Sequence, residues 1–394
     1  MLTVKQFFKQ KMILGGVLGI MAAVIIASFA FMGSTVNPIP KDLPIAMVIQ
    51  DTGVNLPGQG SVNLGDKIKE QILQNKQSPV KWTFLQTQED VLQGMKDKKY
   101  YAAIVFPPEI SQQLVSLTTP KGQQAEVQVL VNQGMNYNAA MVSSQMIDRF
   151  IGGINENIRN TLLDQLSQRN MTLTTEQAKL LANPFIAKTE LIHPVQARTG
   201  NGNIPIMLTQ ILWITTLISS LVLFIAVQKF TNGRVTGKSV LSQILAGSVF
   251  VTVIASLTLF IAHTILDVNI PNQGEIFLLL LFFGFMFFLL QSAVLNWIGR
   301  VGVPILMVVF FFSMPTLSLA HEFLPDVTKH WLYSWTPFKY SVEAFRNSFF
   351  FGGYGIGSYV QTMGFLGLVS LIIMVLAVFK GKDKQKGSLS TESV

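Results

Sequence analysis

The sequence predicts an α-helical membrane protein with six spans and a soluble α/β domain inserted between the first and the second span. Composition is the first indication: 49% of the 394 residues are hydrophobic and 13% are charged, whereas soluble globular chains carry about 25% charged residues. The second is a set of six apolar runs, and the third is a stretch of soluble composition at residues 34–203. Residues 1–33 then form the amino terminus with the first span, and residues 204–379 form the other spans.

Each apolar run is long enough to cross a bilayer as a helix. The first, residues 12–32, reaches about 31 Å at a rise of about 1.5 Å per residue. A cleaved signal peptide is the alternative, because Ser28-Phe29-Ala30 resembles a cleavage site. The core of a signal peptide has about 7–15 residues, and this longer run favours an uncleaved helix. The other runs cover residues 204–227, 240–266, 276–298, 301–320 and 359–379.

The positions of the charged residues predict which side of the membrane each connection faces. Segments that six spans place in the cytoplasm carry eleven basic residues, against the acidic Asp383 and Glu392. These basic residues are Lys5, Lys9, Lys11, Lys229, Arg234, Lys238, Arg300, Lys380, Lys382, Lys384 and Lys386. The connection after the third span carries Asp267 and Glu275 and no base. We therefore expect both termini, with the basic tail at residues 380–394, in the cytoplasm, and we attribute the net charge of +8 to this asymmetry and to contact with anionic membrane lipid rather than to nucleic acid.

Residues 34–203 alternate strand and helix patterns, which predicts an α/β layer with a mixed sheet. Residues 43–50 are typical of a strand that ends in the turn signal Asp51-Thr52-Gly53, and residues 55–60 are typical of a loop. Thr87 is expected to cap a short helix. Further strands are expected at residues 81–86, 100–106, 125–131 and 185–193, and helices at residues 64–73, 88–95, 138–168 and 176–182.

The predicted helix at residues 138–168 carries a stripe of apolar residues three or four positions apart, from Ile147 to Leu166. Such a stripe packs on the sheet of its own domain, or it contacts a second subunit or another partner, and both interpretations stay open. Gly152 and Gly153 are expected to bend this helix, because glycine is a poor helix former.

Residue types that most catalytic and metal sites need are scarce. Without cysteine the chain has no disulfide, thiolate metal site or cysteine nucleophile, and its four histidines are too few for a histidine-rich metal site. Residues 233–239, with the sequence GRVTGKS, resemble a phosphate-binding loop. They have three residues between the glycines where that loop needs four, and they follow a membrane span in place of a strand. We expect no cofactor, no metal and no enzymatic activity.

The interiors of the predicted spans contain no Asp, Glu, Lys or Arg. Transporters coupled to protons or ions usually need such a group, so we expect that the chain does not power transport by itself. His263, near the outer end of the third span, is expected to be an interfacial or hydrogen-bonding residue rather than a proton relay. Amides within the spans are expected either to bond neighbouring helices or to line a path for an amphipathic substrate. They are Gln210, Gln243, Gln291 and Asn296.

Several residues of the predicted domain resemble, in order and spacing, the outer domain of the phage-infection-protein (YhgE/Pip) family. The matching positions are Pro44, Asp51, Gly53, Gly65, Tyr100, Tyr101, Pro107 and Asn132. Gln50 is a mild departure, because the family favours asparagine there. The resemblance implies a protein of the bacterial cell membrane, and members of the family serve as phage attachment factors.

The membrane half resembles the ABC-2-type permease fold, so the predicted fold class is ABC-2-permease-like. The most similar stretch lies between the last two spans and is expected to form an outer re-entrant region, in which Pro315 and Pro337 break helices near the membrane interface. Its marker residues are Pro315, Pro325, Pro337, Tyr340, Glu343 and Arg346. The resemblance implies a homodimer and a role in export or in remodelling of the envelope.

In ABC-2 permeases, the connection after the second span lies where a separate ATPase subunit touches the membrane part. Here it carries Lys229, Arg234 and Lys238, which we expect to contact such an ATPase or else to bind anionic lipid. The leading hypothesis is a permease subunit that exports a lipid-like, peptide or envelope-related substrate. The alternative is a non-transporting envelope scaffold or receptor, for a phage or a secretion component, that acts through the outer domain.

Overall fold

The computed structural model describes residue 21 and residues 40–56, 60–74, 78–119, 122–168, 172–330 and 336–389, with side chains for all of these except residues 56, 315, 316, 327 and 381–389. It divides into two compact units, one formed by residues 40–195 and the other by the described residues from 196 onward. The predicted first span, apart from residue 21, and the end of the basic tail lie outside the described residues, so both stay predictions.

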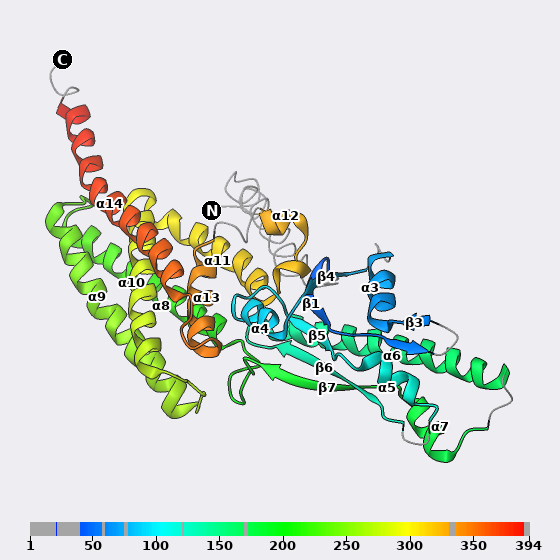
Figure 1. The fold of residues 1–394 in the computed structure, drawn as a ribbon. Helices are drawn as coiled ribbons and strands as arrows, with labels where there is room; N and C mark the ends of the chain where they lie inside the picture. The colour runs from blue at the N-terminus through cyan, green and yellow to red at the C-terminus, as the bar shows by residue number, and fades with distance from the viewer. Residues whose placement is uncertain are drawn as a thin grey trace, which may run out of the picture. The chain divides into compact units, whose positions relative to one another are not determined.

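A mixed sheet forms the centre of the first unit. Its strands are β1 (Leu43–Ile49), β4 (Val80–Leu85), β5 (Ala102–Phe106), β6 (Ala125–Asn132) and β7 (Phe185–Ile192). They lie in the order β4-β1-β5-β6-β7 (Figure 1). β1 pairs in parallel with β4 and β5, β6 is antiparallel to β5, and β7 is parallel to β6. The predicted α/β region near the amino terminus is confirmed.

Helices cover both faces of this sheet. They are α3 (Leu64–Gln74), α4 (Gln88–Lys96), α5 (Ile110–Ser116), α6 (Tyr137–Gln168) and α7 (Thr175–Ala182). On one face, Ile45 and Ile104 share a core with apolar residues of α3, α5, α6 and α7. On the other face, Val48 packs against Val91 and Met95 of α4. Because β1 is buried on both faces, its sequence is a nearly continuous apolar run.

Three details of this unit differ from the sequence-based expectations. Residues 55–60, expected to be a loop, contribute to an antiparallel ribbon of β2 (Val54–Leu56) and β3 (Gly60–Val62), in which Val54 pairs with Val62. The short helix α5 was not predicted. Helix α6 continues through Gly152 and Gly153, because side chains before and after them pack in the core and tertiary packing outweighs helix propensity.

The second unit is mostly helical. Its longer helices are α8 (Ile204–Phe230), α9 (Gly237–Phe260), α10 (Gln273–Ile298), α11 (Gly302–Ser318), α13 (Phe338–Phe350) and α14 (Ile356–Leu389). Within the described part of the chain, four helical runs are long and apolar enough to cross a membrane: Ile204–Phe230, Gly237–Ile265, Gln273–Met314 and Ile356–Lys380. These runs cover the predicted spans from the second to the sixth, and the number of six spans stays a prediction.

The run Gln273–Met314 contains two of the predicted spans, and its halves lie side by side rather than end to end. Phe287 of α10 and Phe310 of α11 both pack against the ring of Phe338, with centroid distances of 5.9 and 6.0 Å. In a straight helix these two residues would be about 34 Å apart. The chain turns back at Gly299, whose φ of 74° lies in the left-handed region that favours glycine.

One predicted helix break does not occur where it was expected. α11 continues through Pro315 and ends at Ser318. A proline inside a membrane helix removes one backbone hydrogen bond, and neighbouring groups can satisfy the freed carbonyl. Proline was therefore a poor marker of the end of this helix.

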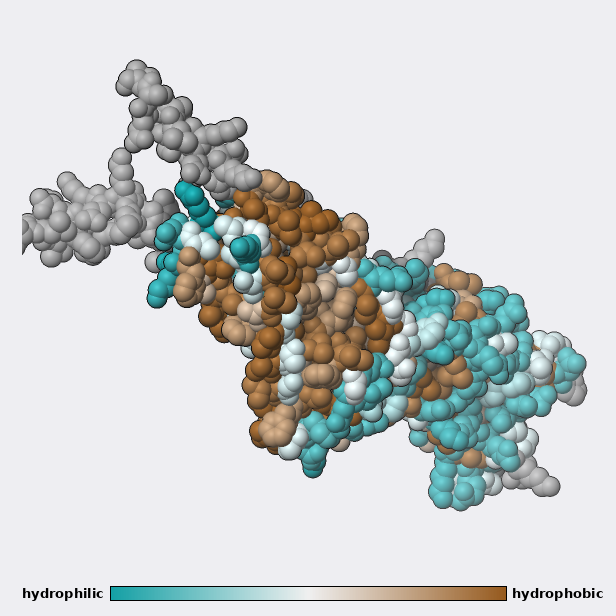
Figure 2. Space-filling model, turned by 90° about the vertical axis from the view of Figure 1, so that its left-hand side faces the viewer, coloured by the Kyte–Doolittle hydropathy of each residue, from teal (hydrophilic) through white to brown (hydrophobic). Residues whose placement is uncertain are grey.

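Apolar side chains cover the outside of the second unit. Figure 2 shows a continuous hydrophobic surface over these helices, in contrast to the largely hydrophilic surface of the sheet-containing unit. On α9 a row of side chains, four positions apart, is more than half exposed: Leu241, Leu245, Val249, Val253 and Leu257. Soluble proteins rarely expose an apolar face of this extent. We therefore assign this surface to lipid.

Close packing between α9 and α10 depends on Gly247, and a side chain there is expected to destabilise the second unit. A Cβ atom at this position would lie 2.2 Å from two ring atoms of Phe288, which is fully buried and stacked on Phe285. We expect Gly247→Ala to lower the free energy of unfolding by about 1–3 kcal/mol. The matched control is Gly237→Ala in the same helix, where the new Cβ meets nothing within 4 Å. Equal stability losses for the two purified full-length variants would contradict this packing.

Candidate functional site

Basic side chains gather at one end of the second unit. Lys229 lies at the end of α8, Arg234 in the turn that follows and Lys238 at the start of α9. None of these cations forms an ion pair within the described part of the chain. Phe230, the last residue of α8, is 86% exposed. An exposed aromatic ring beside three unpaired cations suits a protein partner or the membrane interface. Sequence reasoning identified the cations and missed Phe230.

The turn that presents these residues is fixed by local hydrogen bonds. The N–H of Gly233 donates to the carbonyl of Gln228 at 3.0 Å, with Gly233 at a φ of 82°. The Thr236 hydroxyl accepts from the N–H of Ser239 at 3.2 Å, and the Ser239 hydroxyl accepts from the N–H of Thr236 at 2.8 Å. These reciprocal bonds cap α9. Residues 233–239 therefore form a helix cap that follows a membrane helix, unlike a phosphate-binding loop.

Two further cations lie at this end. Gln243 in α9 and Asn296 in α10 exchange side-chain hydrogen bonds of 3.0 and 3.4 Å, which brings the start of α9 beside the end of α10. Arg300 follows directly in the turn after α10. The ammonium of Lys380 in α14 bonds the carbonyl of Trp297 and lies 5.7 Å from the centre of its ring. Residues 229–240, 295–302 and 373–380 contain five cations and no carboxylate, which is typical of a cytoplasmic membrane edge.

The opposite end of the unit has a different composition. Arg198, before α8, forms an ion pair with Asp267, after α9. The N–H of Asn269 donates to the carbonyl of Arg198 at 3.3 Å. The side chains of His263 and Gln273 form a hydrogen bond of 2.8 Å. This bond agrees with the predicted hydrogen-bonding role of His263 near the outer end of its helix.

Amides in the interior join neighbouring helices. The Gln291 amide of α10 donates to the carbonyl of Trp213 in α8 at 3.0 Å. The Ser292 hydroxyl donates to the Ser220 hydroxyl at 3.2 Å, and the pair of Gln243 and Asn296 joins α9 to α10. For Gln243, Gln291 and Asn296, the predicted role in bonding helices is therefore confirmed. A lining role in a substrate path stays a hypothesis.

α13 packs among the membrane helices. The ring of Phe338, its first residue, lies 4.5 Å from the ring of Trp213 in α8 and 5.9 Å from that of Phe287, halfway along α10. Beyond the other end of α13, a Cβ atom at Gly353 would lie 3.2 Å from Oε1 of Glu275, in the first turn of α10. α13 therefore runs from the middle of α10 back toward its start, which is the geometry of a re-entrant helix.

A buried ion pair lies on α13. Glu343 and Arg346 contact each other one turn apart, with side chains that are 15% and 9% exposed. This segment was expected to form an outer re-entrant region, and a buried charge pair among the helices of the second unit was not predicted. A signal was present: Phe338, Val342 and Phe345 recur at helical spacing and are fully or almost fully buried.

The other marker residues of the predicted re-entrant region are dispersed. Pro337 immediately precedes α13, and Tyr340 in its first turn is half-buried, with the ammonium of Lys339 5.0 Å from its ring centre. Pro325 lies before the short helix α12 (Asp326–Thr328). Pro315 lies inside α11. The structure thus brings Pro337, Tyr340, Glu343 and Arg346 together on one helix and places Pro315 and Pro325 elsewhere.

In the first unit, the Asp51 carboxylate lies just after β1 and forms hydrogen bonds with three other parts of the chain. It accepts hydrogen bonds from the hydroxyl and the N–H of Ser111 at 2.5 and 3.2 Å, and from the N–H groups of Gly65 and Gly53 at 2.9 and 3.1 Å. Gly65 and Ser111 lie in the first turns of α3 and α5, so one carboxylate caps two helices. Burial raises the pKa of Asp51. Together, these hydrogen bonds lower it by more, so the pKa of Asp51 lies below its usual value of 3.8.

Gly65 is required by close approach. A Cβ atom there would lie 2.4 Å from Cγ2 of Ile49 and 2.9 Å from Cβ of Asp51. Only glycine lets the start of α3 come this close to the end of β1. Gly65 and the Asp51 carboxylate therefore both stabilise the contact between the start of α3 and the end of β1.

A second group of the motif residues surrounds Asn132. Its side-chain amide donates to the carbonyl of Tyr100 at 3.2 Å, and its Oδ1 lies 3.0 Å from Nδ1 of His193. Its N–H donates to the carbonyl of Tyr101 at 2.8 Å, and the N–H of Tyr101 donates to the carbonyl of Pro44 at 3.1 Å. These bonds join the start of β1, the start of β5 and the end of β6.

The family-like motif residues therefore divide between the two ends of the sheet. One end holds Asp51, Gly53, Gly65 and Pro107, and the other holds Pro44, Tyr100, Tyr101 and Asn132. The hydrogen bonds of these residues join segments of the same unit, so these positions stabilise its fold and do not meet in one binding site.

Comparison with known proteins identifies the family. A family model described as "ABC-2 family transporter protein" matches residues 13–379, nearly the whole chain. The chain belongs to this ABC-2 transporter family. A domain provisionally assigned to an ABC type-2 transporter from Thermotoga maritima MSB8 is similar over 38% of this chain and 86% of that chain, with 20% identity and a TM-score of 0.26. No curated protein matches the chain significantly.

As an ABC-2 transporter protein, the chain is a multi-pass membrane protein, and permeases of this family normally work with an ATPase subunit. Within the described residues, no three His, Asp or Glu side chains lie close enough to hold a metal ion. That this ABC-2 protein has no cofactor, no metal and no enzymatic activity stays a prediction. The basic end, with three cations that form no ion pair within the described residues, is one surface that suits a partner.

Proposed function

We propose that the chain is an ABC-2-type permease subunit that exports a lipid-like, peptide or envelope-related substrate and is driven by a separate ATPase. The single observation that carries this proposal is the family match over residues 13–379. We further propose that it is a YhgE/Pip-type protein of the bacterial cell membrane, works as a homodimer and has no enzymatic activity of its own. The family-like residues around Asp51 and Asn132 support the YhgE/Pip assignment.

The charge distribution supports a six-span topology with both termini in the cytoplasm. Five cations without a carboxylate mark one end of the helical unit, and basic residues concentrate on cytoplasmic connections of membrane proteins. The turn at Gly299 supports counting α10 and α11 as separate spans. With the apolar run at residues 12–32, this reading gives six.

The connection between α8 and α9 is the proposed contact for the ATPase. Lys229, Arg234 and Lys238 are unpaired within the described residues, and Phe230 adds an exposed apolar anchor. Cations alone suit anionic lipid as well as protein. A large aromatic residue at the centre of a polar rim is typical of a protein interface and favours the ATPase.

Purification from the native membrane tests the proposal. A tagged full-length chain is expected to bring down an ATP-binding subunit in a fixed ratio and to run as two permease copies per complex. A stable homodimer without any such subunit, in cells where the chain is functional, would contradict the transport proposal. A monomeric permease in the same complex would contradict only the homodimer.

Charge reversal separates the two interpretations of the basic connection. The triple variant Lys229→Glu, Arg234→Glu, Lys238→Glu is expected to reduce recovery of the ATPase by at least about tenfold, because rim charges that attract the partner become repulsive. The control reverses three exposed lysines of the sheet-containing unit, at Lys69, Lys81 and Lys188, and is expected to leave recovery unchanged. Full recovery with the first variant would assign these cations to lipid.

The scaffold or receptor hypothesis has one observation in its favour, an open apolar groove in the first unit. Deletion of residues 40–195 discriminates between the two functions. A permease that keeps ATP-dependent export without this unit excludes the receptor hypothesis. Loss of function together with an intact ATPase complex favours it.

A further inference from the structure

An open groove runs along α6 in the first unit. Two adjoining pockets, of about 510 and 350 Å³, share Gln71, Ile154 and Asn157 among their lining residues and so form one continuous groove. One wall is α6 and the other is built mainly from β4, α3 and α5. The lining positions on α6 extend from Met146 to Gln165, which corresponds to about 29 Å of helix. Each pocket has the size of a small-molecule site.

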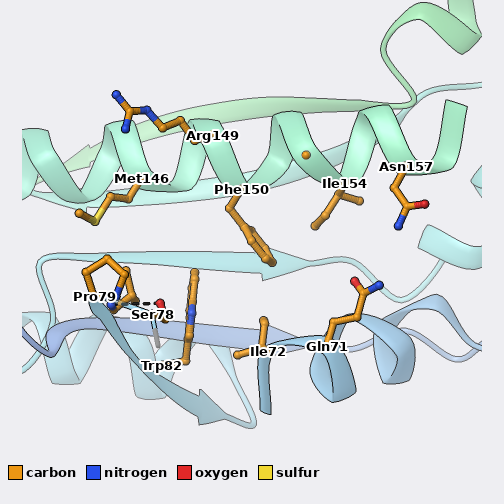
Figure 3. Close-up of a pocket in the computed structure, with 12 residues that line it drawn as sticks. Gln71, Ile72, Ser78, Pro79, Trp82, Met146, Arg149, Phe150, Ile154 and Asn157 are labelled. Carbon is orange, nitrogen blue, oxygen red and sulfur yellow. Dashed lines mark hydrogen bonds between the residues drawn. The ribbon is translucent and has the colours of Figure 1, made fainter. Parts of the chain in front are cut away.

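The inner surface of the groove is apolar. Figure 3 shows Met146, Phe150 and Ile154 of α6 pointing toward Trp82 and Ile72 on the opposite wall. Farther along, Ile158 and Leu162 continue the same surface. The apolar stripe predicted on this helix is thus divided: Ile147, Ile151 and Leu166 are buried in the core, and the other members are half-buried in the groove.

The width of the groove restricts what can enter. The rings of Trp82 and Phe150, from opposite walls, lie 5.2 Å apart between centroids, so the walls touch at this point. An α-helix, about 10–12 Å across, does not fit into such a slot. An extended peptide would bring a row of amide groups that need hydrogen-bond partners, and most of the lining side chains are apolar. A hydrocarbon chain is thinner than an α-helix and has no group that needs a hydrogen-bond partner.

The charged side chains that line the groove indicate which head group a bound hydrocarbon chain would carry. The lining residues of the two pockets include the cations Arg149 and Lys67 and no carboxylate. Arg149 is a lining residue whose side chain leaves α6 on the side away from Trp82 and Phe150, toward the end where Met146 lies (Figure 3). Neither cation forms an ion pair within the described residues. This arrangement suits an acidic head group held outside the slot.

We propose that this groove binds a single-chain amphiphile with an anionic head group, of the lysophospholipid type, with the hydrocarbon chain between Trp82 and Ile154. Because the chain is a membrane protein, lipids of this type are available to it. The proposal concerns binding to the first unit and does not depend on an ATPase or on transport.

Two neighbouring glycines provide a matched test. Gly153 lines the groove and Gly152 does not, and a Cβ atom at either position meets nothing within 4 Å. Both lie in the middle of α6, where replacing glycine with a residue that has a side chain favours the helix. Gly153→Leu and Gly152→Leu should therefore both fold, and only the first places a side chain in the groove.

The full-length protein in phosphatidylcholine nanodiscs is irradiated with a lysophosphatidylglycerol that carries a diazirine in its acyl chain. We expect labelled peptides from residues 71–82 and 146–157. Labelling should fall about tenfold in Gly153→Leu and stay unchanged in Gly152→Leu, a factor that corresponds to about 1.4 kcal/mol. Excess lysophosphatidylglycerol should compete better than lysophosphatidylcholine, by about threefold, and Arg149→Gln should remove this preference.

Equal labelling of the two leucine variants, or labels only on the membrane helices, would overturn the proposal. Equal competition by the two lysolipids would overturn the assignment of an anionic head group. A photoreactive side chain introduced at Ile154 in cells tests the other occupants. Capture of a second copy of the chain or of another protein there, in place of lipid, would also overturn it.

Discussion

Removing one partner of the Glu343–Arg346 pair is expected to destabilise the helical unit by about 3–5 kcal/mol, because the remaining charge stays buried and loses the opposite charge that it contacts. Both side chains are largely buried, at 15% and 9% exposure, on a helix whose first residue packs in the middle of the unit. Glu343→Gln and Arg346→Met should each show this loss in purified full-length protein, measured as the free energy of unfolding in a detergent titration.

The double variant Glu343→Gln, Arg346→Met is expected to recover most of the stability, because two uncharged side chains of similar size need no counter-ion. The matched control is the exposed pair of Glu176 and Lys179, also three positions apart, with side chains 79% and 69% exposed. Glu176→Gln should cost no more than about 0.5 kcal/mol in its own unit. Additive losses in the double variant would show that the two charges do not compensate each other.

Asp51→Asn is expected to lower the stability of the first unit by about 2–3 kcal/mol at neutral pH. The carboxylate accepts hydrogen bonds from Ser111, Gly65 and Gly53, and an amide can accept at only one of its two terminal atoms. Native-state hydrogen exchange of the β1 amides in the full-length protein measures this loss as the free energy of local opening. The control is Asp66→Asn, which replaces an exposed carboxylate next to Gly65 in the first turn of α3.

The effect of Asp51 also has a defined pH dependence. Because its pKa in the folded protein is lower than the usual 3.8, the carboxylate contributes its full stabilisation above pH 3.8 and loses it as the pH falls through the folded pKa. The difference in opening free energy between the parent protein and Asp51→Asn should therefore be constant from neutral pH down to about 5 and shrink below 3.8. A difference that persists unchanged in acid would contradict the hydrogen-bond account.

Local patterns predicted most of the helices and strands. Features that depend on residues close together in sequence can be predicted from one sequence. They include the apolar run at β1, the cap at Thr87 and the apolar runs of the later membrane helices. Thr87 forms the expected capping box with Asp90. The ribbon of β2 and β3 and the helix α5 were missed, because they are short and are held by distant contacts such as the bond from Ser111 to Asp51.

The candidate sites were predicted less completely. The basic connection was predicted from its charge. Phe230 was not predicted, because the sequence does not show whether an aromatic residue at the end of an apolar run is buried or exposed. The segment around Arg346 was expected to form an outer re-entrant region because it resembles that region of ABC-2-type permeases, and the burial of its charges was not predicted. Its apolar residues at helical spacing were the available evidence for burial. The groove along α6 depends on where β4 and α3 lie, which the stripe on α6 alone does not reveal.

Site-specific crosslinking at Phe230 tests the central claim, that this end of the chain contacts a separate ATPase, most directly. A photoreactive amino acid replaces Phe230 in the full-length protein, and a control places it at Phe260, an exposed ring at the far end of α9. After irradiation of intact membranes, the account predicts that position 230 captures an ATP-binding subunit and position 260 does not. Capture of lipid alone at position 230, or of the same partner at both positions, would contradict it.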